Sequence, residues 1–216
     1  DPHPNPNPNP ATAISVVGTV AGFGSVFVNG IEFETESASR RIDDKDGFDD
    51  SDLSVGMKVK IEGTLNDDGT GRADSVYYDD DLEGIVANLA ADPTDDTMIT
   101  FTLLGATVSA ENGRTAFKDE VDPNFGFDTL AEGDHLEVSG EYLGGVLWAS
   151  YIKNEDSLDD DFEAKGVVLG LNGVDGVTLV LTGGSTREVT VSGRALITAA
   201  GISDSQYVEV ERKVTD

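Results

Sequence analysis

The sequence predicts an all-β protein made of three tandem small OB-like β-barrel domains, the third lacking its last strand. Short runs rich in Val, Ile, Thr and aromatic residues recur between clusters of Gly, Asp and Asn, and helical periodicity is nearly absent. The same order of apolar runs also returns three times along the chain. Three strands, a short link and two further strands is the order of a small OB-like barrel.

Each repeat opens with a similar first strand: "VVGTVAGFG" (16–24), "LEGIVANLA" (82–90) and "AKGVVLGLN" (164–172). A hairpin-like pair of runs follows, "SVFVNGIEFET", "MITFTLLGATVSA" and "GVTLVLTGGSTREVTVS". In the first pair, Asn29 and Gly30 predict a tight type I′ turn, because both central residues of that turn need a positive φ.

A short polar link, irregular or one helical turn, is expected before the fourth strand. That strand reads "VGMKVKIEGTL", "EGDHLEVSGEY" and "SDSQYVEVERK" in the three copies. Its core positions recur at period two, which predicts that one face is buried; these are Val59 and Ile61, Leu136 and Val138, and Val208 and Val210. The third copy departs from the pattern where Arg212 replaces Gly63 and Gly140.

A fifth strand closes only the first two copies, as "GRADSVYY" and "VLWASYIKN", and each runs into an acidic junction, "DDDLEG" or "DDDFEAKG". These boundaries predict an N-terminal Pro/Asn-rich tail with a donor strand (1–17), two complete barrels (18–81 and 82–161) and an incomplete third barrel (162–216).

The stretches "GTVAGFGSVFVNGIEFET", "LSVGMKVKIEGTL" and "ADSVYYDDDLEG" carry a resemblance to a known family. From about Ile14 onward the chain resembles the bacterial domain-of-unknown-function family numbered 5666, whose members are typically exported and carry this domain in tandem. The resemblance implies the fold and export. It implies no activity, because the family has no assigned chemistry.

The charge balance excludes several partners. A formal net charge of −28 repels phosphate backbones and anionic lipids, so we expect no nucleic-acid partner. No apolar run reaches the length of a membrane span, so no membrane insertion is expected. The first residue is Asp1 rather than Met, as in a mature protein after signal-peptide removal, and we expect an extracellular or cell-surface location.

No catalytic constellation is recognisable. The chain has no cysteine, and its two histidines are His3 in the tail and His135 in an expected strand. No P-loop, Rossmann glycine pattern or HExxH motif is present. Trp148 with Tyr151 could stack on a sugar, but an aromatic residue in a closing strand is more often part of the core. We therefore expect a protein that is not an enzyme.

Acidic clusters are the candidate metal sites, and calcium is the expected cofactor. Crowded carboxylates repel one another unless a cation neutralises them. The candidate ligands are Asp43, Asp44, Asp46, Asp49, Asp50 and Asp52 in the first loop, and Asp79, Asp80, Asp81, Asp159, Asp160 and Asp161 at the junctions. A solvated acidic surface remains the alternative, and it is weighed equally at the junctions.

The N-terminal segment offers a partner for the third repeat. "ATAIS" aligns with "ADSVY" and "ASYIK" of the two fifth strands, so a stray fifth strand precedes the first repeat while the third repeat lacks one. Donation to a neighbouring copy would be β-augmentation, and a head-to-tail contact that does not close grows a filament. The residues assigned to this contact are Ala11, Thr12, Ala13, Ile14, Ser15, Val16, Val17, Val208 and Val210.

Two functions follow from these observations. The first is a non-enzymatic structural subunit that polymerises with copies of itself through this donated strand. The second is a secreted, calcium-dependent module array that binds carbohydrate or another surface protein.

Overall fold

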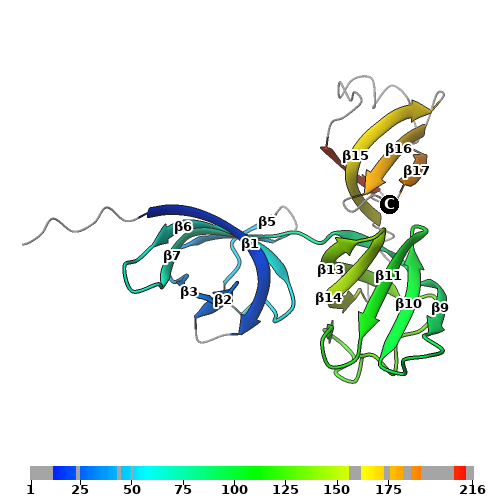
Figure 1. The fold of residues 1–216 in the computed structure, drawn as a ribbon, viewed down its shortest axis with the longest axis horizontal. Coiled ribbons are helices and arrows are strands. Elements are labelled where there is room, and N and C mark those ends of the chain that lie inside the picture. The colour runs from blue at the N-terminus through cyan, green and yellow to red at the C-terminus, as the bar shows by residue number, and fades with distance from the viewer. Residues whose placement is uncertain are drawn as a thin grey trace, which may run out of the picture. The chain divides into compact units, whose positions relative to one another are not determined.

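The computed structural model describes residues 12–22, 25–42, 45–49, 51–155, 162–172, 176–181, 186–190 and 207–212. All regular secondary structure in these ranges is β-strand, which confirms the predicted all-β class (Figure 1). Within them, no helix is long and apolar enough to span a membrane. The chain divides into two compact units, Asp1–Asp79 and Asp80–Asp216.

The first unit is a closed barrel. Its strands are β1 (Thr12–Gly22), β2 (Val26–Val28), β3 (Ile31–Glu34), β4 (Ser39–Ile42), β5 (Lys45–Asp46), β6 (Lys58–Leu65) and β7 (Gly71–Tyr78). The ring runs β1-β2-β3-β7-β6 and returns to β1, with β3 and β7 parallel and every other pair antiparallel. Five strands in this order form the expected OB-like barrel.

Alternation along the strands places the core as the sequence predicts. Val59 and Ile61 of β6 are buried, and so are Phe33 of β3 and Val76 of β7. Successive side chains of a strand point to opposite faces, so a period-two apolar pattern fills the barrel interior. The β2–β3 turn at Asn29 has φ values of 52° there and 78° at the following glycine, as a type I′ turn requires.

The link between the third and fourth strands of the barrel is extended rather than helical. It forms the short hairpin β4–β5, and β4 runs parallel to β7. Ala38 and Ile42 are buried there, which favours a strand lying against the barrel. The Arg40 guanidinium donates to the carbonyl oxygens of Thr35 and Ala38, at 2.6 and 3.0 Å, and so holds the turn that precedes β4.

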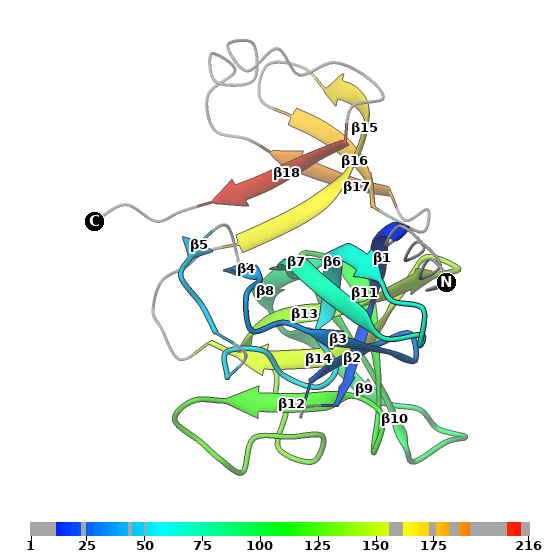
Figure 2. The same cartoon turned by 90° about the vertical axis from the view of Figure 1, so that its left-hand side faces the viewer.

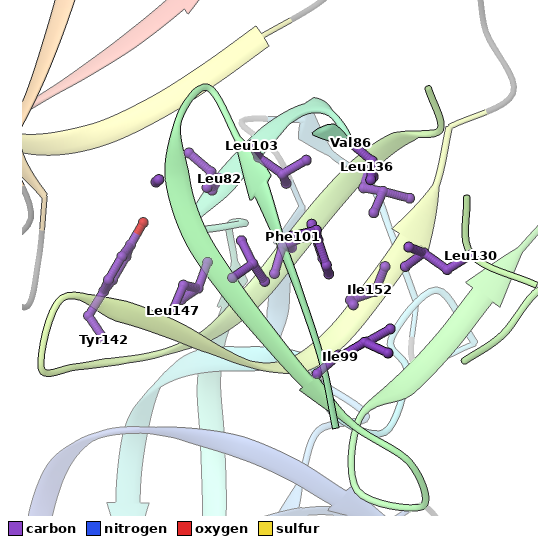
Figure 3. Close-up of a cluster of buried hydrophobic side chains, with 14 residues drawn as sticks. Leu82, Val86, Ile99, Phe101, Leu103, Leu130, Leu136, Tyr142, Leu147 and Ile152 are labelled. Atoms are coloured by element: carbon purple, nitrogen blue, oxygen red, sulfur yellow. The ribbon is translucent and has the colours of Figure 1, made fainter. Parts of the chain in front are cut away.

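The second unit begins with a barrel of the same plan. Its strands are β8 (Leu82–Ile85), β9 (Ala87–Ala91), β10 (Met98–Leu103), β11 (Ala106–Glu111), β12 (Ala116–Asp119), β13 (His135–Leu143) and β14 (Val146–Asn154). As in the first barrel, the third strand pairs in parallel with the last, here β11 with β14. Leu136 and Val138 are buried, as predicted, in the apolar cluster of Figure 3.

The two barrels repeat the same hydrogen bonds at the bend of the first strand. Val20 donates to the carbonyl of Met57 and accepts from the N–H of Gly56. Val86 makes the corresponding pair, donating to Asp134 and accepting from Gly133. Val86 divides β8 from β9, so these two strands together correspond to β1.

The third repeat contributes β15 (Phe162–Asn172), β16 (Gly176–Leu181), β17 (Thr186–Thr190) and β18 (Tyr207–Arg212). β15 pairs with β16 and with β18, and β16 pairs with β17 (Figure 2). β15 also pairs with β8, so repeats two and three share one sheet.

Candidate functional site

The N-terminal donor segment has a partner inside its own barrel. Thr12–Val17 form the first half of β1 and pair with β6 from Leu65 to Lys60. This corrects the prediction of a separate stray strand: no turn residue interrupts "TAISVVGTV", so the segment continues the first strand of the repeat. Ala11 lies outside the described residues.

The other edge of β1 carries no strand along this half, among the described residues. β2 reaches β1 only at Val20 and Gly22. Val20 donates toward β6, whereas the Val17 carbonyl accepts the Asn29 side-chain amide on the opposite side, at 2.9 Å. Backbone groups alternate in direction along a strand. Ala13 and Ser15 therefore direct their N–H and C=O groups to the same open side as Val17.

The side chains of β1 follow the same alternation. Ile14 and Val16 are half-buried, while Ala13 and Ser15 are exposed. Val17 is 57% exposed, and it places one apolar side chain on the outer face of β1. The face that carries this side chain is available to a partner of the open edge.

β18 also has one open edge within the described part of the chain. The corresponding strands β6 and β13 each pair on both sides, with β1 and β7 and with β8 and β14. The described strands give β18 a single partner, β15. Val208 pairs with Gly166 and Val210 with Ala164, and the side chain of Val208 packs against the core of the second barrel.

Repeats two and three are already joined by strand pairing. Leu82 of β8 pairs with Ala164 of β15, and these residues are equivalent positions of their repeats. The Lys165 ammonium, which is buried, donates to the Asp80 carbonyl at 2.6 Å and lies 3.9 Å from its carboxylate. An edge-to-edge joint between two of these repeats is thus present within the chain.

The junction acids that are described have protein partners. Lys165 offsets the charge of buried Asp80, and the Asp81 carboxylate accepts the N–H of Gly140 at 2.9 Å. Asp79 is half-buried at the end of the first unit. The second junction, Asp159 to Asp161, lies outside the described residues.

The first acidic loop is only partly described, since Asp43, Asp44 and Asp50 lie outside the described residues. The Asp49 carboxylate accepts from the Ser51 hydroxyl and N–H, at 2.5 and 2.7 Å. The Asp52 carboxylate accepts the Asp49 N–H at 2.8 Å, and Asp46 belongs to β5. Among the described residues, no three acidic or histidine side chains gather as metal ligands would. Calcium binding stays a prediction.

Four exposed aspartates share a turn in which the carboxylate accepts from both the hydroxyl and the N–H of a serine or threonine two places on; they are Asp49, Asp68, Asp92 and Asp95. At Asp92 the Thr94 hydroxyl, followed by the Thr94 N–H, lowers the pKa from the ordinary 3.8. The other three pKa values are lowered in the same way. Each turn favours the ionised carboxylate.

We expect these turns to create an acid limit of stability. A lowered folded-state pKa gives stability that is complete above the unfolded pKa and is lost as pH falls through the folded value. Titration of the carboxyl carbons by NMR should give pKa values below 3.8 at Asp68 and Asp92. Thr94→Val should return Asp92 toward 3.8 and leave Asp68 unchanged. An unshifted Asp92 in the parent protein would contradict the assignment.

Two residues considered for chemistry have structural surroundings. His135 is buried, with Nε2 3.1 Å from Glu83 Oε1 on the neighbouring strand. Tyr151 is fully buried whereas Trp148 is 44% exposed, so the two aromatic rings do not share a surface. A polar hollow that no sequence motif indicates lies on the outside of the first barrel, over β4, β6 and β7. Its residues meet only through the pairing of these three strands.

A family model matches both barrels of this chain. The family model described as a domain of unknown function, DUF5666, matches residues 14–76 and 83–153. The first match spans β1 to β7 and the second spans β8 to β14, so each covers one barrel. No curated protein gives a significant match.

Proposed function

The chain belongs to the DUF5666 family through two tandem copies of its domain, and on this premise we propose that it is a non-enzymatic structural subunit, acting outside the cell, that polymerises head to tail. The open edge of β1 in one copy adds to the open edge of β18 in the next. The proposal keeps the N-terminal strand in its own barrel and uses its second edge.

The observation that carries the proposal is the single partner of β18 among the described strands, where β6 and β13 have two. An unpaired strand edge is a template for another chain. β1 supplies a complementary edge without losing β6, because Ala13 and Ser15 face the other side. The joint between β8 and β15 supports only the first half of this contact: it pairs two first strands, and so favours the outer edge of a first strand as a place where another strand adds.

This contact is heterologous, because the donor and acceptor surfaces differ. Heterologous contacts of this kind give rings or open filaments. Each backbone hydrogen bond contributes only about 0.5–1.5 kcal/mol net. A joint of a few such bonds is reversible, so assembly should increase with protein concentration.

Proline substitution tests the two edges separately. Ser15→Pro removes an N–H on the open side of β1 while the β6 hydrogen bonds remain, and proline is tolerated on edge strands. Glu209→Pro does the same on β18. By correspondence with Val59 and Ile61 of β6, the backbone groups of Val208 and Val210 are directed to β15, so that the N–H of Glu209 is directed to the open edge. The parent protein should form long assemblies, which negative-stain microscopy and light scattering detect. Neither variant alone should form them.

Mixing the two variants is the decisive measurement. Ser15→Pro keeps an intact β18 and Glu209→Pro keeps an intact β1, so an equal mixture should form a complex of two molecules and nothing longer. If Glu209→Pro still self-associates while Ser15→Pro does not, two β1 edges pair with each other and the head-to-tail proposal is wrong. A parent that stays monomeric at high concentration would also overturn it.

A further inference from the structure

The polar hollow of the first barrel is built from a row of side chains across three strands. Tyr77 of β7 is the register partner of Arg41 on β4 and of Lys60 on β6. Register partners project from the same face of a sheet. Tyr77 is half-buried and lies between Val76 and Tyr78, which face the core, so its ring belongs to the outer face.

A second row lies beside the first and carries hydroxyl groups. Ser75 of β7 is the register partner of Ser39 on β4 and of Glu62 on β6. Both rows line one hollow of about 350 Å³, to which the β5 residue Asp46 also contributes. This volume is at the lower end of the range for small-molecule sites.

The hollow is lined by both charge signs, with Arg40, Arg41 and Lys60 against Asp46 and Glu62. Lys60 forms an ion pair with Glu62 at 2.5 Å, and Arg41 is the register partner of Asp46. The Arg41 guanidinium lies 6.0 Å from the Tyr77 ring centroid, within the range of a cation–π contact. The hollow therefore offers strong donors and strong acceptors together, without a large net charge.

This combination discriminates between ligand classes. An anionic ligand would be drawn by the cations but opposed by Asp46, Glu62 and a chain of net charge −28. A neutral sugar ring presents hydroxyls that both donate and accept, and its C–H face packs on an aromatic ring. Hydrogen bonds from ionised groups are about twice as strong as neutral ones.

We propose that this hollow binds one ring of a neutral saccharide, with Tyr77 as the packing surface and Arg41, Lys60 and Glu62 as hydrogen-bonding groups. The site lies over β4, β6 and β7. OB-folds commonly bind oligosaccharides on the face of strands two and three, so this is a different surface. No β1 residue lines the hollow, although Lys60 and Glu62 are the register partners of Val17 and Ser15 on the strand whose other edge the proposed assembly uses.

The test is an NMR titration of the full chain with cellotriose, maltotriose and chitotriose, and with trigalacturonate as the anionic counterpart. At least one neutral trisaccharide should shift amide signals of Arg41, Lys60 and Tyr77 at millimolar concentration, with little dependence on salt. Tyr77→Ala should weaken binding at least tenfold and Tyr77→Phe by less than threefold. The melting temperature of each variant establishes that it is folded.

Trp148→Ala is the matched control, because it removes an exposed aromatic residue from the other unit. It should leave the affinity unchanged. Binding that is lost in Trp148→Ala and kept in Tyr77→Ala would move the site to the second barrel and overturn the proposal. Preference for trigalacturonate with strong salt dependence, or no shift with any neutral trisaccharide, would overturn it as well.

Discussion

Replacing Phe101 with alanine is expected to lower the free energy of unfolding of the second unit by about 3–5 kcal/mol, the usual cost of removing a buried phenylalanine. Phe101 lies on β10 and is 1% exposed. In Figure 3 its ring lies in the middle of the apolar cluster, among residues that include Leu103, Leu136 and Ile152. Alanine would leave a cavity. β10 cannot move to fill it, because backbone hydrogen bonds to β9 and β11 hold the strand on both sides.

Urea unfolding followed by tryptophan fluorescence measures this loss. Trp148 is the only tryptophan of the chain and belongs to the second unit, so its emission reports that unit alone. Thr100→Ala on the same strand is the control, because Thr100 is only half-buried, and it should cost less than about 1 kcal/mol. A loss for Phe101→Ala as small as that of the control would mean that the core is not packed around this ring.

The repeat pattern could be predicted from the sequence because its turns and alternation are local. The residue types of Asn29 and Gly30 alone predict the turn between β2 and β3. The second repeat uses Leu104–Gly105 at the same place, with φ values of 46° and 76°, although leucine rarely adopts a positive φ. The turn there is recognised only through the flanking strands, because tertiary packing overrides the preference of the residue.

The strand pairings that decide the candidate sites were harder to predict. "ATAIS" resembles a fifth strand in its letters, yet the absence of a turn before Val16 makes it part of β1. The polar hollow depends on β4 lying parallel to β7, which follows it by more than thirty residues along the chain. Neither strand register is encoded in a short motif. The proximity of Arg41, Tyr77 and Lys60 therefore could not be predicted from the sequence.

Gly140→Ala is expected to lower the free energy of unfolding of the second unit by about 2–3 kcal/mol, as overpacking does in a tight interior. Gly140 lies at a break in the β13–β14 register, where β14 crosses closely. A Cβ atom there would overlap the backbone carbonyl oxygen of Trp148, and backbone cannot rotate away as a side chain can. Gly63 has the same relation to the Arg72 carbonyl in the first barrel.

The matched control is Gly126→Ala, where an added Cβ meets nothing within 4 Å; it should change the same fluorescence transition by less than about 0.5 kcal/mol.

Arg212 stands at the corresponding position of the third repeat. It pairs with Phe162 as Gly63 pairs with Ile14, so it occupies the glycine position of its repeat. The glycine is required only where a fifth strand pairs with the fourth strand through the register shift seen at Gly63 and Gly140. Arg212→Gly should therefore lower the free energy of unfolding by about 0.5–1 kcal/mol, the usual entropic cost of glycine in a strand, and a strand added to β18 by a neighbouring copy should pair there in a regular register. A clear stabilisation by Arg212→Gly would instead indicate that a bulged fifth strand packs against β18.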